Sequence, residues 1–331
     1  MGAGREIKSV PEELVQFIKS GSRFIIAGHK EPDGDCAGSQ LALRSALVRL
    51  GKEVLVCSAG PFKRTELRHL SGQFITEPAE EEKINAKLII VDCGSRERTG
   101  DLEKFLDGLP CAIIDHHEAG KHLPSSPENP VYLDADAPSC TLLIDKLIAA
   151  LGLELTEEEA QLLFFGLCTD TGFFRHLDEK NGEVFTAAAK MVDNGANPKD
   201  TFHIMNGGKS LKSRVLLGHL LLQTESHFHG KLLLTYETHD EFKTFGFEAR
   251  DSESLNKLLQ SIEGVQANVI IRQELADDCT VSLRSTDEID VAQIAASLGG
   301  GGHRNAAGFT MRGNISNIKQ IMLEAFSKVF Q

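Results

Sequence analysis

The sequence predicts an α/β protein with two domains. The first is built on a parallel sheet with helices on both faces, and the second is a smaller α/β domain. The length of 331 residues is comfortable for two domains of about 100–200 residues each. Hydrophobic residues make up 41% and charged residues 25%, which excludes disordered and coiled-coil classes. From residue 23 to residue 117, short apolar runs alternate with helical patterns, as expected for a parallel sheet that is buried on both faces.

Four strands and four helices are expected in the N-terminal domain. The strands are the apolar runs 23–29, 52–58, 87–93 and 111–117. A helix between the first two strands ends at Gly51, so these three elements form a βαβ unit. Three further helices are expected over 139–152, 156–172 and 182–195, and Thr156 and Glu159 have the spacing of a capping box.

The pattern changes after Gly195. The next segment is polar and loop-like at its centre, and strand patterns follow at 231–238, 266–275 and 279–285. We therefore expect an N-terminal domain over 1–195, a linker over 196–215 and a second domain over 216–331.

Acidic and imidazole side chains follow three of the four N-terminal strands, at or just past their carboxyl ends. A single Asp at such a place is usually a helix cap or a turn former. The carboxyl ends of parallel strands border one crevice, however, so these side chains should converge there. The residues are His29, Asp33 and Asp35 after the first strand, Asp92 at the end of the third, and Asp115, His116 and His117 at the end of the fourth.

These residue types predict a metal site. Carboxylates with imidazoles and no thiolate favour Mn²⁺, with Mg²⁺ or Co²⁺ as alternatives, and disfavour structural zinc. The spacing H-x-x-x-D-x-D suggests two ions, because Asp33 and Asp35 on a tight loop can point to different neighbours. A pair of ions is a known device for displacement at phosphorus, so we expect hydrolysis of a phosphate ester.

The sequence resembles the DHH phosphoesterases in five motifs. Four of them are GHKEPDGDCAGS (28–39), VDCGS (91–95), IDHHE (114–118) and GLCTDTGFFRH (166–176). The fifth, GGGGHRNAAGF (299–309), is similar to the signature of the DHHA1 substrate-binding domain. The resemblance covers essentially the whole chain, and the length is similar to that of the stand-alone branch that degrades nanoRNA and 3′-phosphoadenosine-5′-phosphate (pAp).

The resemblance implies two Mn²⁺ ions and a role for each motif residue. His29, Asp33 and Asp92 would hold one ion, and Asp92 would bridge to a second ion held also by Asp35, His116 and Asp170. His117 would face the scissile phosphate, Asp115 would support the ligands, and Asp92, Asp115 and His117 are thus the expected catalytic residues. Cys36 and Cys93 stand where relatives often carry Ala and Thr, beside the ligands without replacing one.

Positive groups are needed to hold an anionic substrate, because two divalent ions and four carboxylates leave the metal site roughly neutral. The glycine run before His303 lets backbone amides approach a phosphate, although such a run can also be a flexible linker. The adjoining HRNAAGF favours substrate recognition. The expected substrate-binding residues are Arg272, Arg284, Ser285, Gly300, Gly301, Gly302, His303 and Arg304.

The net charge of −13 disfavours long nucleic acid as a partner, and 6% aromatic residues leave little for base stacking. We therefore expect short oligoribonucleotides, pAp or dinucleotides as substrates. A phosphodiesterase for linear or cyclic dinucleotides is the main alternative, and a catalytically silent nucleotide sensor is a lower one. Pyrophosphatase is less favoured, since that branch lacks the glycine-rich second domain.

Seven cysteines without a C-x-x-C pair are typical of reduced thiols, so we expect a cytoplasmic protein. No apolar stretch approaches the roughly 18 residues that span a bilayer, and no membrane partner is expected. Members of the family often form homodimers, but no segment of this sequence identifies an interface.

Overall fold

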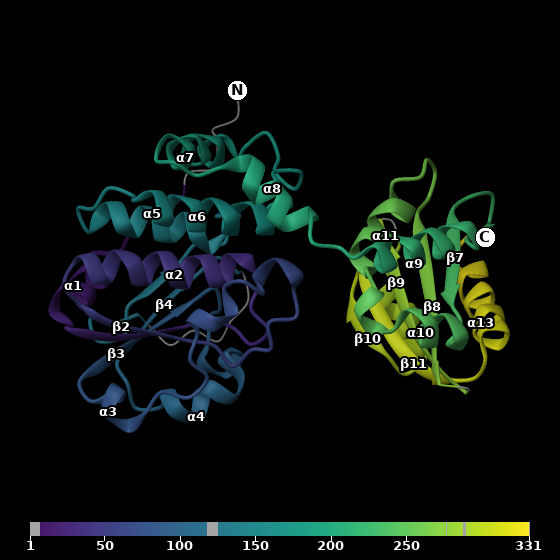
Figure 1. Cartoon of the computed structure of the whole chain (residues 1–331), viewed down its shortest axis with the longest axis horizontal. Coiled ribbons are helices and arrows are strands. Elements are labelled where there is room, and N and C mark those ends of the chain that lie inside the picture. The colour runs from purple at the N-terminus through teal and green to yellow at the C-terminus, as the bar shows by residue number, and fades with distance from the viewer. Residues whose placement is uncertain (1–6, 118–124, 276, 287–288, 331) are drawn as a thin grey trace. The chain divides into compact units, whose positions relative to one another are not determined.

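The computed structural model describes residues 7–117, 125–275, 277–286 and 289–330. The chain divides into two compact units, Met1–Gly208 and Lys209–Gln331 (Figure 1). This division falls within the predicted linker, but most of that segment is helical. Helix α8 (Pro198–Asn206) belongs to the first unit and α9 (Leu211–Leu222) to the second. Asn197 caps α8 by accepting hydrogen bonds from two backbone amides, which explains how a polar segment starts a helix.

The first unit contains a five-stranded parallel sheet in the order β2-β1-β3-β4-β5. The predicted α/β fold class is confirmed, and the four predicted strands are all present. The fifth strand was not predicted, because its three residues carry too short a pattern. The strands are β1 (Arg23–Ala27), β2 (Glu53–Cys57), β3 (Ala86–Val91), β4 (Cys111–Asp115) and β5 (Val131–Leu133).

Alternate residues of the strands feed two separate cores, as the pleat requires. Phe24 and Ile26 of β1 pack with the helices α1 (Glu12–Ser20), α2 (Gly34–Arg49), α5 (Cys140–Ala150) and α6 (Glu157–Asp170), and Ile25 faces α4 (Glu103–Leu106). Figure 1 shows α2 between the sheet and the α5 and α6 layer. The remaining α-helices of this unit are α3 (Glu80–Lys83) and α7 (Gly182–Asp193).

The second unit contains a mixed six-stranded sheet in the order β10-β11-β9-β8-β7-β6. Only β7 and β8 pair in parallel, and the other neighbours are antiparallel. Leu233 and Ile270 pack on one face with α9 and α11, whereas Leu234 and Val269 pack on the other with α12 and α13. The elements are β6 (Glu225–His227), β7 (Leu232–Glu237), α10 (His239–Phe245), α11 (Ser252–Gln260), β8 (Ala267–Leu275), β9 (Asp278–Ser285), α12 (Val291–Ser297), β10 (Gly301–His303), β11 (Ala306–Arg312) and α13 (Ile315–Ser327).

Candidate metal centre

A first group of ligand atoms surrounds His29, two residues after β1. The Nε2 atom of His29 lies 3.4 Å from Asp92 Oδ2 and 3.7 Å from Asp33 Oδ1. Its Nδ1 atom lies 2.8 Å from the carbonyl oxygen of Lys30. Because a carbonyl can only accept, Nδ1 carries the proton in the neutral ring, and Nε2 presents its lone pair to the two carboxylates.

A second group surrounds His116, which follows β4. Its Nε2 atom lies 3.3 Å from Asp92 Oδ1, 3.4 Å from Asp170 Oδ2 and 3.7 Å from Asp35 Oδ2. Its Nδ1 atom donates to the carbonyl oxygen of Ala137 at 3.1 Å. The structure thus brings together all six residues predicted as metal ligands, and Asp92 belongs to both groups.

The spacing of these atoms fits divalent cations. Two ligand atoms that each lie about 2.1 Å from one ion, at angles of about 90–110°, are about 3.0–3.5 Å apart. The separations around His29 and His116 lie at or just above this range and exceed ordinary hydrogen-bond lengths. Asp92 is 1% exposed, and its Oδ1 atom has no hydrogen-bond partner. A bound cation would satisfy that buried oxygen.

Asp92 has a left-handed backbone conformation, with φ of 58°. Asp tolerates this region better than most residues, although it still costs about 1–3 kcal/mol. The turn directly follows β3 while the Asp92 amide still donates to the Ile114 carbonyl of the neighbouring strand. This conformation directs the carboxylate across the end of the sheet, between the two histidines.

Asp35 is fully buried, and the start of α5 compensates its charge. Its carboxylate accepts hydrogen bonds from the backbone amides of Cys140 at 2.5 Å and Thr141 at 2.9 Å. These amides are unpaired donors of a helix N-terminus, where negative charge is favoured. This support was not predicted from the sequence, although a helix starting at 139 was.

Close packing of α2 on α6 brings Asp35 near Asp170. A Cβ atom on Gly38 would lie 2.6 Å from the Leu162 carbonyl oxygen, and one on Gly166 would lie 3.1 Å from both the Gly34 carbonyl oxygen and the Asp35 Cα atom. The two helices can therefore approach only because both positions lack a side chain. Asp170 is the last residue of α6, so the helix crossing sets the position of its carboxylate.

His117 and Asp115 form a second pair at the end of β4. Asp115 is fully buried, and its Oδ1 atom lies 2.8 Å from His117 Nδ1. The same oxygen accepts hydrogen bonds from the amides of His116, at 2.8 Å, and His117, at 3.2 Å. Asp115 therefore orients both histidines, and His117, with 39% of its side chain exposed, keeps Nε2 free of this contact.

Protons on the two histidines compensate the negative charge of the carboxylates in both ligand groups. Burial alone would lower the pKa of His116, but its close contact with Asp92 and the charges of Asp35 and Asp170 raise that pKa to about 10. Burial would likewise lower the pKa of His29, but its contacts with Asp33 and Asp92 raise that pKa far above the ordinary value. Burial and neighbouring carboxylates raise the pKa of Asp170 to about 6. The carboxylates thus stabilise positive charge at both positions.

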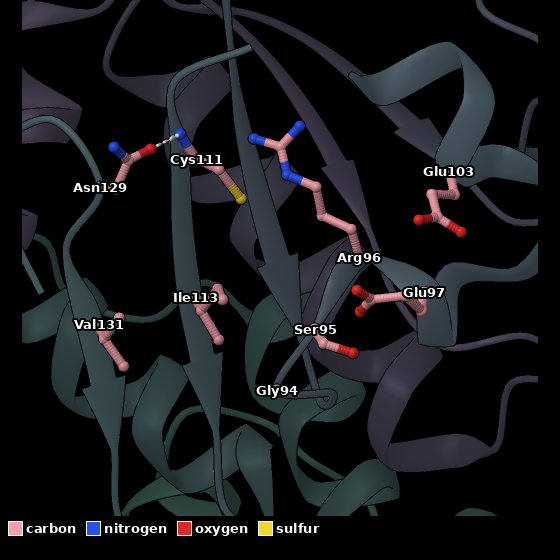
Figure 2. A pocket seen from close by; sticks show the side chains of 9 residues that line it. All are labelled: Gly94, Ser95, Arg96, Glu97, Glu103, Cys111, Ile113, Asn129 and Val131. Carbon is pink, nitrogen blue, oxygen red and sulfur yellow. Dashed lines mark hydrogen bonds between the residues drawn. The ribbon is translucent and has the colours of Figure 1, made fainter. Parts of the chain in front are cut away.

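A cavity of about 330 Å³ is lined by none of the six predicted metal ligands (Figure 2). It is lined by Gly94 and Ser95, which follow β3, and by strand residues such as Cys111 and Ile113. Arg96 also lines it, but its guanidinium donates to the carbonyls of Leu106 and Leu109, at 2.7 and 2.6 Å. This cavity therefore does not offer an uncommitted cation to a phosphate. A different arginine contacts a predicted metal ligand: the Nη2 atom of Arg64 lies 3.7 Å from Asp33 Oδ2. Arg64 was not among the residues predicted from the sequence.

The predicted substrate-binding residues of the second unit occupy different environments. Arg284 is half-buried, and one of its donors bonds the Leu283 carbonyl at 3.0 Å. Arg272 is buried and lies 3.3 Å from the buried carboxylate of Glu237, so this guanidinium is committed inside the unit. Ser285 is also buried and donates to the Ile289 carbonyl at 2.7 Å.

The glycine run forms neither an open loop nor a linker. Residues Gly301–His303 are the exposed edge strand β10, paired with β11, and Gly300 precedes it. A Cβ atom on Gly300 would lie 2.3 Å from the Gly308 carbonyl oxygen, and one on Gly302 would lie 2.5 Å from that of Ala306. These two glycines permit the tight hairpin that holds the exposed His303 and Arg304.

Comparison with known proteins agrees with this arrangement. Residues 23–167 match the DHH family, N-terminal domain, and residues 233–330 match the DHHA1 domain. The chain is 30% identical over 307 residues to the bifunctional oligoribonuclease and PAP phosphatase NrnA of Thermus thermophilus, covering 91% of this chain and 88% of that protein. The chain belongs to the DHH/DHHA1 phosphoesterase family. It is therefore a hydrolase of that family, whose members use divalent metal ions.

Two further comparisons extend the likeness. The Bacillus subtilis NrnA, described in the same words, is 26% identical over 306 residues, covering 89% of this chain and 91% of that protein. The crystal structure of an exopolyphosphatase-related protein from Bacteroides fragilis shares the fold, with a TM-score of 0.81, 22% identity and 96% coverage of both chains. Among the described helices, none combines the length and apolar character that a membrane span needs.

Proposed function

We propose that this DHH phosphoesterase hydrolyses short oligoribonucleotides to mononucleotides and also removes the 3′-phosphate of pAp. The observation that carries the proposal is the meeting of two ligand groups at Asp92, whose two carboxylate oxygens face His29 and His116 respectively. A shared carboxylate is the arrangement expected for two adjacent ions at a phosphate ester. The similarity to two proteins described as oligoribonuclease and PAP phosphatase supports this choice of substrates.

His29, Asp33 and Asp92 would hold one ion, and Asp35, Asp92, His116 and Asp170 the other. When bound, two divalent ions such as Mn²⁺ activate water and neutralise charge on the phosphoryl oxygens. We assign proton handling at the reacting phosphate to His117, because Asp115 holds its Nδ1 and leaves Nε2 available. Asp115 is a positioning residue, since its buried oxygen bonds His116 and His117 rather than solvent.

We assign the substrate anion to Arg284, His303 and Arg304 of the DHHA1 domain, as the family resemblance implies. His303 and Arg304 are exposed and Arg284 is half-buried, whereas Arg272 is paired with Glu237. In this proposal Arg272 and Ser285 shape the domain interior, and the glycines 300–302 form the hairpin that presents His303. The acidic net charge restricts the substrate to a few nucleotides, because an extended polyanion would be repelled.

Asp92→Ala and His116→Ala should each abolish turnover of an RNA dimer in the presence of Mn²⁺. Each removes a ligand from a buried, charged cluster, and Asp92 is shared by both ligand groups. Release of mononucleotide from a radiolabelled dimer measures the effect. His69→Ala, a change outside all three groups of potential ligands found in the described residues, is the control and should keep wild-type turnover. Near-wild-type activity of either ligand variant would disprove this site assignment.

A phosphodiesterase for dinucleotides is the second candidate. The cyclic-di-AMP phosphodiesterase PdeA of Listeria monocytogenes is 26% identical over 314 residues, although the chain covers only 46% of that protein. Parallel assays of the RNA dimer, pAp, cyclic di-AMP and pyrophosphate with Mn²⁺ separate the candidates. We expect cleavage of the dimer and of pAp. Preference for cyclic di-AMP would favour the second candidate, and inertness toward all four would favour a nucleotide sensor.

A further inference from the structure

The Cys36 thiol lies close to His29 and Asp92 of the first ligand group. Nothing in the motif that contains Cys36 requires a thiol. Cys36 is the third residue of α2, and its amide donates to Asp33 at 3.0 Å. Its side chain is fully buried. A Cβ atom on Gly28 would lie only 2.2 Å from Cys36 Sγ, so the sulfur packs against the backbone that leads directly into His29.

The sulfur lies among ligand atoms. One ligand atom each from His29, Cys36 and Asp92 lie within 4.8 Å of one another, so the three residues together could hold a metal ion. The other neighbour of the sulfur is Gln40 Oε1, at a long 3.8 Å. The Gln40 amide nitrogen is held by the carbonyls of Ile26 and Cys57, at 3.3 and 3.0 Å, so the side chain has little freedom to approach more closely.

The donor atoms beside the sulfur also point to a cation at this position. Asp92 is 1% exposed, and its Oδ2 atom lies 3.4 Å from His29 Nε2. The lone pair of that nitrogen is made available by the Nδ1 contact with the Lys30 carbonyl. An imidazole lone pair, a buried carboxylate and a thiol thus face one small volume, and the three donor types together suit a divalent transition metal.

Cys93 provides a contrast at equal burial. It follows Asp92 directly and is fully buried, like Cys36. Its side chain packs in the apolar cluster on the α4 side of the sheet, with Ala27 and Leu102. It belongs to none of the three groups of potential ligands found among the described residues. Proximity to a ligand in sequence therefore does not by itself bring a thiol into the centre.

We propose that Cys36 is a thiolate ligand of the ion held by His29, Asp33 and Asp92. Binding replaces the S–H bond by a metal–sulfur bond, and the proton leaves to solvent. This ligand makes the two positions chemically unequal, because the group around His116 offers only imidazole and carboxylate. The His29 position should prefer Co²⁺, Zn²⁺ or Cd²⁺ over Mg²⁺, since thiolates favour soft ions. A centre without thiolate was expected from the sequence, and a Cys36 ligand, whose assignment rests on the proposed metal centre, changes that expectation.

The test is Co²⁺ titration of the metal-free full chain, followed by absorption spectroscopy. Visible ligand-field bands report that cobalt is bound, and a near-ultraviolet thiolate-to-cobalt charge-transfer band reports sulfur ligation. We expect both in the wild type. Cys36→Ser should lose the near-ultraviolet band and keep the visible bands, while Cys93→Ser, the matched buried control, should keep both.

A second variant controls for misfolding of Cys36→Ser. Cys36→Ala leaves the small side chain that relatives often carry there, and circular dichroism checks its fold. Its Cd²⁺ affinity by calorimetry should fall by at least about tenfold, which is the lower end even for groups that only support a ligand. Its Mg²⁺ affinity should remain close to the wild-type value.

The outcomes separate the two proposals. Absence of any cobalt binding to the wild type would disprove the metal centre itself, and this inference with it. Two bound cobalt ions without a near-ultraviolet band would disprove only the role of Cys36. Survival of that band in Cys36→Ser, or an unchanged Cd²⁺ affinity in Cys36→Ala, would also overturn it.

Discussion

Asp92 connects the two halves of the proposed centre within one side chain. Its Oδ2 atom lies 3.4 Å from His29 Nε2, and its Oδ1 atom lies 3.3 Å from His116 Nε2. The left-handed backbone at this residue is unfavourable, so the surrounding strands must hold it in place. Asp92 could be predicted as a metal ligand from the sequence. Its left-handed conformation could not be predicted, because φ depends on how β3 ends against β4.

Asp115→Asn should reduce kcat by about 10–100-fold and leave metal content unchanged. Asn keeps the size of the side chain but removes the negative charge that orients His117 through Nδ1. Steady-state kinetics with Mn²⁺ and elemental analysis of the loaded protein measure both effects. A change confined to kcat, with KM preserved, would distinguish orientation of His117 from loss of substrate binding.

Asp134→Asn is the matched control for this variant. Asp134 is also buried and accepts hydrogen bonds from backbone amides, those of Lys8 and Asp136, at 2.6 and 3.1 Å. It follows β5, the neighbouring strand, and within the described part of the chain its hydrogen bonds involve no histidine. Its substitution should lower stability without the kcat effect. Equal losses of kcat in both variants would contradict the positioning role of Asp115.

At the scale of elements, the crossing of α2 and α6 determines where the ligands meet. Asp35 lies in the first turn of α2 and Asp170 at the last residue of α6. The two helices approach through Gly38 and Gly166, which have neighbouring atoms where a Cβ would be. Glycines about one turn away from Asp35 and Asp170 therefore set the distance between these two carboxylates.

Gly38→Ala should destabilise the protein by about 1–3 kcal/mol and weaken binding at the His116 group. The added Cβ would lie 2.6 Å from the Leu162 carbonyl, which belongs to a helix backbone and cannot rotate away. Urea unfolding and Mn²⁺ calorimetry measure the two effects. Gly218→Ala is the control, because Gly218 lies within α9 with no atom near its Cβ position. It should be stabilising by about 0.5–1 kcal/mol, and an equal loss in both variants would contradict the packing argument.

The elements with strong apolar patterns could be predicted, and those set by local pairing could not. The runs that became β1 and β3 are almost continuously hydrophobic, which is how a strand buried on both faces appears in a sequence. Strand β10 was missed because glycine is rare in strands, and only its pairing with β11 extends it. Helix α8 was missed because the polar and glycine residues around it make the segment look like a loop, although Asn197 and Pro198 at its start are a helix N-terminal signal.

The residues of the candidate site also include some that could be predicted from the sequence and some that could not. Ligands at strand ends converge by topology, so His29, Asp92 and His116 could be placed near one another in advance. Asp170 ends a helix, and only the family resemblance connected it with them. The support of Asp35 by two amides of α5, the position of Arg64 and the direction of Cys36 Sγ depend on helix packing, which no local pattern encodes.

At the scale of the whole molecule, protonation and metal binding are coupled to folding. The pKa of His116 lies near 10 in the metal-free structure, above its ordinary 6.5. The folded state therefore holds this proton more tightly than the unfolded chain does, and the resulting stability is fully present only below about pH 6.5. It is lost as pH rises through the folded-state pKa.

Metal-free protein should therefore lose stability between about pH 7 and about pH 9, where the unfolded chain has already released this proton. Each kcal/mol lost should lower Tm by about 2–4 °C. Mn²⁺-loaded protein should lack this dependence, because its histidines are held as neutral ligands. Thermal unfolding at several pH values with and without Mn²⁺ is the measurement. A metal-free Tm that rises over this range would show that the histidines do not carry the proposed protons.

Among the residues that the structure describes, each of the five buried clusters takes its side chains from one of the two units only. The packing that supports the ligands is thus not shared with the sheet that bears Arg284 and the glycine hairpin. Substitutions in one unit can accumulate without repacking the interior of the other. Selection can then change which phosphate ester the protein prefers while the metal chemistry stays the same. Substrate preference in such a protein can therefore diverge faster than the type of reaction that it catalyses.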